Sequence, residues 1–342
     1  MAGFIKSKKY YAVLLVLLVL LVALPFMRGR KKFITNTGVV WTTEYHITYK
    51  AKVDLNDSIQ QLLKKIDDSV SPFNKQSAIT AINDNKTDAV DEYFVKLYNK
   101  SAEVNRKSDG LYDPTVMPLV NAWGFGYKSG ALPTKLQIDS ILCFIGLERT
   151  SLNGSKLKKE DPRLQFDFSS IAKGMACDEI AAMLTRNGAS NYIVEIGGEV
   201  VARGVNERGV SWHVSIDMPI ADDENGAVHA NALIVKLDSL AIATSGNYRK
   251  FKEVDGKRVS HIINPKTGMS ETSNLLSVSI VAKDCMTADA WATACMAMGL
   301  ERTQTMIEKN SELGVMTISA DTDGNFVVWS NKRFADLVEK AK

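Results

Sequence analysis

Apolar and polar positions change their period in the middle of the chain. Residues 163–168 alternate between apolar and polar side chains, which is typical of a strand with one buried face. From Ile171 onward the apolar positions recur with helical spacing, and Gly188 ends the stripe. Residues 167–180 (DFSSIAKGMACDEI) therefore predict a strand, a tight turn capped by serine, and a helix. The first N–H groups of such a helix suit an anion such as phosphate. On this stretch alone an ordinary capped helix, with Lys173 on its solvated side, is the favoured interpretation.

The same criteria divide the remainder of the chain into strands and helices in loose alternation. Predicted strands occupy a paired segment at 33–53, then 191–196, 212–216, 232–237, 275–282 and two segments within 315–330. Predicted helices occupy 55–70, 89–107, 134–143, 287–298 and 331–340. No long linker, internal repeat or low-complexity segment interrupts residues 33–342. The expected fold is a single α+β domain in which mixed or antiparallel sheets are flanked by helices.

The first 32 residues differ from the rest because they contain a long uncharged apolar run. Residues 11–27 carry no charge, three lysines precede them and four basic residues follow within 28–32. The run is long enough for a short membrane span, and small residues at a plausible cleavage point are poor. Residues 1–32 are therefore predicted to form an uncleaved membrane anchor rather than a removed signal. Basic residues on both sides leave its orientation undecided by charge.

The composition mainly excludes classes of partner and of cysteine chemistry. The 342 residues are 45% apolar and 24% charged, and much of the basic excess behind the net charge of +3 lies near the N-terminus. No basic stripe interleaved with aromatic residues is present, which argues against nucleic acid as a partner. The four cysteines are widely spaced without a CxxC pair, and Cys177 and Cys295 fall within apolar helical patterns. These two are predicted to be small buried hydrophobic residues.

Several candidate ligand-binding segments are turns rich in small or aromatic residues. Residues 111–130 have no clean period and contain Trp, Phe, Gly and Pro, so they either line a ligand or form a buried aromatic plug. Gly197 and Gly198 follow a predicted strand, where paired glycines allow close approach of a ligand or simply make a tight turn. Residues 241–248 and 260–268 end strands in turns that can present side chains to a substrate.

The predicted helix at 287–298 carries two oxygen-bearing side chains on one face. Asp289 and Thr293 are four residues apart, and both are hard donors that suit Mg²⁺, with substrate phosphates completing the coordination. Alternatively, Thr287 caps the helix, Asp289 complements its dipole and Thr293 lies at the surface. Without other evidence the second interpretation is favoured.

Six segments of the chain, taken in order, resemble the ApbE family of FAD:protein FMN transferases. The matching segments are YDPTVMPLVNAWGF at 112–125, DFSSIAKGMACD at 167–178, VEIGGEV at 194–200, ATSGNY at 243–248, HIINPKTG at 261–268 and ADAWATA at 288–294. The resemblance covers essentially everything after the N-terminal run. Thr42 stands where the family usually has Gly, a departure that concerns a local flavin contact only.

The resemblance implies an activity, a metal and a base. The family cuts the pyrophosphate of FAD, attaches FMN through a phosphoester to a Ser or Thr hydroxyl of a target protein, and releases AMP. By resemblance, Mg²⁺ is held by the carboxylate of Asp289, the hydroxyl of Thr293 and the backbone carbonyl of Ala172. His261 is the candidate to accept the proton of the target hydroxyl, because an imidazole titrates near neutral pH and no other histidine falls in a family segment. A structural histidine is the alternative.

The resemblance also implies flavin contacts. Residues 123–125 correspond to a wall on the flavin or adenosine side of the ligand. Lys173 and Asp178, on the helix after the predicted phosphate turn, are expected to reach ribose or phosphate oxygens. The implied cofactor-binding residues are Trp123, Gly124, Phe125, Lys173, Asp178, Thr244, Ser245, Gly246 and His261.

Three functions remain compatible with the sequence: FMN transfer to a protein, Mg²⁺-dependent hydrolysis of FAD to FMN and AMP, and flavin binding without catalysis. Retention of Asp289, Thr293 and His261 together argues against the third. The resemblance further implies that the domain lies on the periplasmic or extracytoplasmic side of the cytoplasmic (inner) membrane, held by one N-terminal span. Its expected partners are exported flavin-accepting subunits of membrane electron-transport complexes, such as the sodium-pumping NADH:quinone reductase.

Overall fold

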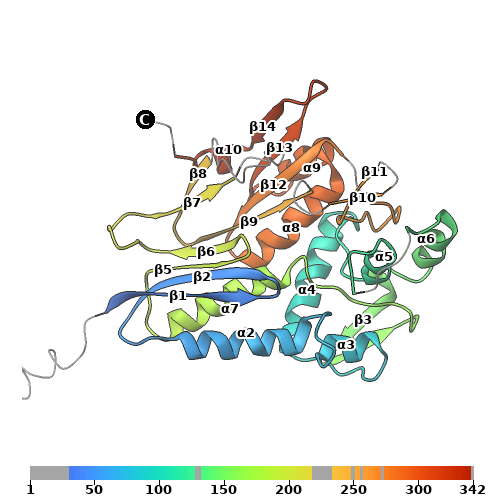
Figure 1. The fold of residues 1–342 in the computed structure, drawn as a ribbon, viewed down its shortest axis with the longest axis horizontal. Coiled ribbons are helices and arrows are strands. Elements are labelled where there is room, and N and C mark those ends of the chain that lie inside the picture. The colour runs from blue at the N-terminus through green and yellow to red at the C-terminus, as the bar shows by residue number, and fades with distance from the viewer. Residues whose placement is uncertain are drawn as a thin grey trace, which may run out of the picture.

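An eight-stranded sheet runs through the middle of the fold (Figure 1). The computed structural model describes residues 31–127, 132–217, 233–247, 251–254, 257–270 and 273–339. Neighbouring strands of the sheet are antiparallel, in the order β1-β2-β5-β6-β9-β12-β13-β14. These strands are β1 (Lys32–Val40), β2 (Thr43–Ala51), β5 (Tyr192–Ile196), β6 (Glu199–Arg203), β9 (Leu240–Gly246), β12 (Leu275–Ala282), β13 (Gly314–Ala320) and β14 (Phe326–Ser330). Three separate two-stranded hairpins are β3 (Thr150–Asn153) with β4 (Lys156–Lys159), β7 (Trp212–Ile216) with β8 (Leu233–Leu237), and β10 (Phe251–Val254) with β11 (Lys257–Ser260).

Helices connect these strands and cover the sheet. They are α2 (Asn56–Val70), α3 (Ala78–Asn83), α4 (Glu92–Lys107), α5 (Met117–Ala122), α6 (Lys135–Leu142), α7 (Ala172–Arg186), α8 (Cys285–Met298), α9 (Leu300–Glu308) and α10 (Lys332–Ala335), with a 3₁₀ turn at Leu147–Arg149. Most predicted elements are confirmed to within a few residues. The predicted strand at 275–282 coincides with β12, and the predicted helix at 287–298 is α8 with two further residues at its start. The expected α+β fold of antiparallel sheets flanked by helices is confirmed.

The sheet separates two apolar cores, because successive side chains of a strand point to opposite faces. Ile280 of β12 belongs to the larger core, and the next residue, Val281, belongs to the smaller one. Helices α2, α4, α7 and α8 cover the first face, whereas the β7–β8 hairpin and α10 cover the second (Figure 1). Helix α8 is apolar on nearly all sides, since it is packed between the sheet and α7.

A third, smaller core lies at one end of the molecule. It joins α5, α6 and β11, which lie close together in Figure 1, through a cluster that includes Leu119, Ile138 and Val259. Trp123, at the end of α5, is part of this cluster and is only 8% exposed. The aromatic segment therefore does close one end of the core, as the plug interpretation expects.

The alternating segment at 163–168 is not a strand, so that prediction is wrong. Its alternation does describe burial, because Leu164, Phe166 and Phe168 are fully buried. The backbone groups of Phe166 are bound by a side chain in place of a neighbouring strand: its N–H donates to Asn83 Oδ1 at 2.7 Å, and its carbonyl accepts from Asn83 Nδ2 at 2.9 Å. A period-two pattern indicates an extended chain with one buried face. It does not show which group forms hydrogen bonds with the backbone N–H and C=O groups.

Some predictions fall outside the described residues. Among the residues that the structure does describe, no helix is long and apolar enough to cross a membrane. The predicted anchor at 1–32 lies almost entirely before residue 31, where the description begins. Residues 128–130 of the aromatic segment and Tyr248 of the ATSGNY segment also lie outside it.

Candidate metal and flavin site

Helices α7 and α8 each bind the N-terminus of the other through a carboxylate. Asp289 of α8 accepts, through Oδ2, a hydrogen bond of 3.0 Å from the backbone N–H of Gly174 in the first turn of α7. Asp178 of α7 accepts hydrogen bonds of 2.9 Å from the N–H groups of Cys285 and Met286, the first two residues of α8. These N–H groups have no partner within their own helices, and negative charge is favourable at a helix N-terminus. The two helices are therefore tied together at both of these ends.

The start of α7 differs from the predicted serine-capped turn. Its N-cap position is Ile171, and no side chain from that position caps the helix. Ser170 donates its hydroxyl hydrogen to the Tyr112 hydroxyl at 3.1 Å instead. The serine cap is therefore wrong, and the anion found at this helix end is the carboxylate of Asp289, supplied by the protein itself.

The approach of the two helices depends on a glycine. A Cβ atom at Gly174 would lie 2.4 Å from the carbonyl oxygen of Cys285 and 2.9 Å from Cβ of Asp289. Both distances are shorter than real contacts allow, so a larger residue would force the helices apart. Because Ala172 begins α7 two residues earlier, the structure brings the two predicted ligand-bearing helices together at this turn.

Thr293 lies one helical turn after Asp289 and faces strand β9. Its hydroxyl is 3.3 Å from that of Ser245, and the neighbouring Thr244 hydroxyl is 2.8 Å from that of Ser279 on β12. Asp289 is only 3% exposed. The predicted metal and flavin residues of α8 and β9 are therefore adjacent in space. Gly246, the last residue of β9, pairs with Ser277 of β12 in the same ladder.

The alternative interpretation of this helix, in which Thr287 is the cap and Thr293 lies at the surface, does not match the structure. The N-cap is Asp284, whose side chain accepts a hydrogen bond of 2.8 Å from the N–H of Thr287. Thr293 is half-buried. Asp289 does complement a helix dipole, but the helix is α7 and not its own.

A buried ion pair lies beside Asp289. Lys173 Nζ is 2.5 Å from Glu199 Oε1, and the other oxygen of Glu199 is buried without a hydrogen-bond partner among the described residues. Burial raises the pKa of Glu199, and the ammonium group of Lys173 opposes this shift. Burial disfavours the ammonium form of Lys173, but Glu199 and Asp289 outweigh it and raise the pKa of Lys173.

Two of the predicted flavin residues have protein partners in this structure. Lys173 is bound to Glu199, and both oxygens of Asp178 are bound to the start of α8. Burial also raises the pKa of Asp178 to about 7, against the effect of the two N–H donors. Their contacts to ribose or phosphate stay predictions.

The segment from Trp123 to Phe125 meets the segment that contains His261. The indole N–H of Trp123 donates to the carbonyl of Gly268 at 2.8 Å. The rings of Phe125 and His261 make an edge-to-face contact with centroids 6.3 Å apart and an interplanar angle of 66°. Gly124 lies between the two aromatic residues, directly after α5. Two segments that the sequence placed far apart are thus joined on one side of the site.

Known proteins resemble this chain over most of its length. The model of the ApbE family matches residues 41–317. The chain belongs to the ApbE family. Its relatives include the FAD:protein FMN transferase of Vibrio cholerae serotype O1, 34% identical over 315 residues that cover 89% of this chain and 92% of the relative. The FAD:protein FMN transferase of Escherichia coli K12 is 35% identical over 315 residues that cover 89% of this chain and 88% of the relative.

Solved structures show the same likeness. The flavin transferase ApbE from Vibrio cholerae superposes with a TM-score of 0.81 at 34% identity, covering 90% of this chain and 99% of that one. The apo form of the flavinyl transferase ApbE from Pseudomonas stutzeri also gives 0.81, at 28% identity, with 92% of this chain and 99% of that one covered. The ApbE fold of the chain is therefore shown over nearly its whole described length.

The donor set of this ApbE chain fits a hard cation. Within the described ranges no group of three or more His, Cys, Asp and Glu side chains could hold a metal ion. The predicted set needs none, because it combines the carboxylate of Asp289 with the hydroxyl of Thr293 and the backbone carbonyl of Ala172. Oxygen ligands of this kind, few in number, suit Mg²⁺, which keeps waters and uses substrate phosphates. The Asp289 carboxylate, the one carboxylate in this predicted set, is buried and bound by the N–H of Gly174.

Sequence reasoning missed two residues of this site in the ApbE chain. Glu199 lies in the VEIGGEV segment without a predicted role, yet its carboxylate is buried against Lys173. Gly174 lies in the DFSSIAKGMACD segment without a predicted role, yet its missing side chain allows the close approach of α8. The segment alignment with the family contained both residues, but only packing between distant parts of the chain shows what they contact.

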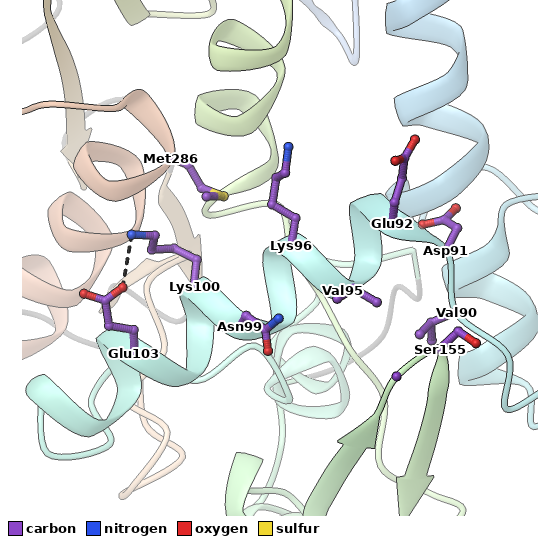
Figure 2. Close-up of a pocket in the computed structure, with 11 residues that line it drawn as sticks. Val90, Asp91, Glu92, Val95, Lys96, Asn99, Lys100, Glu103, Ser155 and Met286 are labelled. Carbon is purple, nitrogen blue, oxygen red and sulfur yellow. Dashed lines mark hydrogen bonds and ion pairs between the residues drawn. The ribbon is translucent and has the colours of Figure 1, made fainter. Parts of the chain in front are cut away.

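The surface also has a groove of about 790 Å³ along α4, away from these residues (Figure 2). Its walls include Lys96, Lys100 and Glu103, and none of the predicted site residues lines it. Met286, whose N–H binds Asp178, contributes its side chain to the groove. The groove therefore reaches the back of the α7–α8 contact and not the candidate site.

Proposed function

We propose that this chain is a Mg²⁺-dependent FAD:protein FMN transferase that attaches FMN to a Ser or Thr hydroxyl of a target protein and releases AMP. Membership of the ApbE family and the names of its relatives support flavin transfer from FAD. The observation that carries the proposal is the contact of Asp289 with the first turn of α7, which brings the two halves of the predicted metal site together.

The metal ligands would be Asp289, Thr293 and the carbonyl of Ala172. Bound Mg²⁺ would neutralise charge on the pyrophosphate of FAD. Asp289 is held in place by the Gly174 N–H, and Thr293 by Ser245. These contacts orient the oxygens before substrate arrives, so little reorganisation is needed.

His261 would accept the proton of the target hydroxyl while the hydroxyl oxygen attacks the FMN phosphorus. A P–O bond to that oxygen forms, the P–O bond to the AMP phosphate breaks, and AMP leaves with the electron pair. The edge contact with Phe125 orients the His261 ring. Trp123, through Gly268, fixes the loop on which His261 lies. The flavin-binding roles of residues 123–125 and 244–246 belong to the same proposal.

Incubation of the purified chain with FAD, Mg²⁺ and a candidate acceptor tests this function. The acceptor should gain the mass of FMN, keep its flavin after denaturation, and release AMP in equal amount. Free FMN and AMP without any acceptor would show that the chain is an FAD pyrophosphatase, in which water replaces the target hydroxyl. FAD binding with neither product would show a carrier. An acceptor whose Ser or Thr is replaced by Ala is the control for the attachment site.

The location and partners are part of the proposal. The uncharged run at 11–27 would anchor the chain in the cytoplasmic membrane, with residues 33–342 on the extracytoplasmic side. The acceptors would then be exported flavin subunits of membrane electron-transport complexes. Protease treatment of spheroplasts should degrade the catalytic domain while cytoplasmic proteins stay intact, and protection of the domain would contradict this orientation.

A further inference from the structure

Asp289 and Asp178 each bind the N-terminus of the opposite helix, but the sequence predicts different roles for them. Asp289 is a proposed metal ligand, whereas Asp178 was expected from sequence to bind ribose or phosphate. We propose that Asp178 is instead a positioning residue, which holds the first turn of α8 on α7 and thereby sets the spacing between Ala172 and Asp289. This inference rests on the proposed function, because it concerns the same metal site.

Both oxygens of Asp178 are used in this contact. Oδ1 accepts from the N–H of Cys285 and Oδ2 from the N–H of Met286, each at 2.9 Å. The next N–H of α8, that of Thr287, is bound by Asp284. The orphan donors of α8 are thus divided between a cap from its own chain segment and a carboxylate from α7. Asp178 joins the helices, whereas Asp284 joins α8 only to itself.

The contact lies beside the close approach of the two helices at Gly174. A Cβ atom at Gly174 would meet the carbonyl oxygen of Cys285 at 2.4 Å, and Asp178 binds the N–H of that same residue. Gly174 and Asp178 are four residues apart, so they lie on one face of α7. Cys285 and Asp289 are also four residues apart and share a face of α8. A shift of α8 at Cys285 is therefore passed to Asp289 one turn later.

The surroundings explain why a carboxylate is needed there. Met286 turns its side chain toward the groove beside α4, with Lys96 and Lys100 in the same wall (Figure 2). Its backbone N–H joins α8 to α7, while its side chain lines the groove. A carboxylate offers a separate oxygen to each of the two successive N–H groups, whereas an amide or a hydroxyl has a single acceptor oxygen for both.

Metal binding by the full chain, purified without flavin, tests the inference. The probe is Mn²⁺, which accepts the same oxygen ligands as Mg²⁺ and whose free form is counted directly by electron paramagnetic resonance. Asp178→Asn should weaken Mn²⁺ binding by about 10–100-fold, the usual effect of losing a residue that orients metal ligands. Its FAD binding in EDTA should stay at the wild-type level, because Asp178 does not contact the nucleotide.

The matched control is Asp284→Asn at the same helix end. Asn caps a helix about as well as Asp, so this variant should bind Mn²⁺ as the wild type does. Equal weakening by both variants would mean that only the stability of α8 matters, and the inference would be overturned. Wild-type Mn²⁺ affinity in Asp178→Asn, or a loss of FAD binding in EDTA, would overturn it as well, the latter in favour of the ribose contact.

Asp289→Ala separates the inference from the proposed function. If Asp289→Ala leaves Mn²⁺ affinity unchanged, the proposed metal site is wrong, whatever Asp178 does. If Asp289→Ala abolishes binding and Asp178→Asn does not weaken it, only the positioning role fails. Should Asp178→Asn not fold, Asp178→Glu keeps the charge but moves it by one methylene. That variant is expected to fold and to bind Mn²⁺ more weakly, and wild-type affinity would then overturn the inference.

Discussion

The two sides of the candidate site are built in different ways. One side is the helix floor, defined as residues 172–174 of α7 and 289–293 of α8. It consists of two helices, each of which binds the N-terminus of the other through a carboxylate. The loop rim, defined as residues 123–125 and 260–268, is joined by an indole hydrogen bond and an aromatic edge contact. In the helix floor the same contacts hold the fold and orient the proposed ligands, whereas the loop rim attaches to a small separate core.

This difference has a consequence for substitution. An added methyl group at Gly174 of the helix floor would move a helix, because the packing at that position leaves no room for it. The loop rim lies on turns, which tolerate change and carry function on top of a rigid scaffold. We expect overpacking at Gly174 to lower stability and metal binding together, and loss of the His261 imidazole to separate activity from stability.

The largest effect is expected from Gly174→Ala in the helix floor. Alanine favours an exposed helix by about 1 kcal/mol over glycine, but here its methyl group meets Cys285 O at 2.4 Å. Overpacking of this kind costs about 1–3 kcal/mol of unfolding free energy, and the displaced Asp289 should no longer support transfer. Urea unfolding and the rate of acceptor flavinylation measure both.

Gly154→Ala is the control for this change. Gly154 has nothing within 4 Å of a built Cβ and a φ of +57°, so its replacement carries only backbone strain, about 1–2 kcal/mol. Transfer should stay unchanged in this variant. A stabilised Gly174→Ala protein, as helix propensity alone would give, would contradict the close-packed helix floor.

The second effect concerns the loop rim. His261→Ala should lower the rate of transfer by about 10²–10⁴-fold, the usual contribution of a general base, while the melting temperature and FAD binding stay close to wild type. The control is His46→Ala, which removes an exposed imidazole paired with Glu195 at 2.8 Å and should leave transfer unchanged. Equal losses of FAD binding and of transfer in His261→Ala would contradict the role of His261 as the general base.

The sequence predicted the separate parts of this comparison better than their contacts. Strand β12 and helix α8 were predictable because their patterns are local: a β-branched run, and an apolar helix that ends at Gly299. The segment at 163–168 was predicted wrongly as a strand, because periodicity cannot show that a side chain, Asn83, satisfies the backbone of Phe166. Its burial pattern was nevertheless right.

The candidate site divides in the same way. The Asp289 and Thr293 spacing was visible in sequence, since four residues make one turn of a helix. The contact of Asp289 with Gly174, 115 positions earlier in the chain, could not be predicted, because no local sequence pattern indicates a contact over that separation. The serine cap failed for the same reason: a distant carboxylate binds the Gly174 N–H in the first turn of α7, and Ser170 binds the Tyr112 hydroxyl instead.

A smaller effect is expected from Thr293→Val in the helix floor, which keeps the shape of the side chain and removes its oxygen. Mg²⁺ affinity should fall by at least about tenfold, as for other groups that bind or orient metal ligands. Thr293→Ser keeps the hydroxyl near Ser245 and should bind Mg²⁺ close to the wild-type level. The Mg²⁺ dependence of the transfer rate measures this, and identical behaviour of Val and Ser at this position would exclude the hydroxyl as a ligand.

The smallest effect is expected from Trp123→Phe in the loop rim. The change removes the indole N–H that donates to Gly268 O at 2.8 Å and leaves a buried carbonyl without its donor, which costs about 1–3 kcal/mol. Trp41→Phe is the matched control, because it removes an indole hydrogen bond of 2.9 Å to Asp67 in a different part of the fold. Both variants should lose stability, but only Trp123→Phe should raise the KM for FAD, since it alone loosens the loop that carries His261. A normal KM in Trp123→Phe would mean that this hydrogen bond serves the small core and not the substrate.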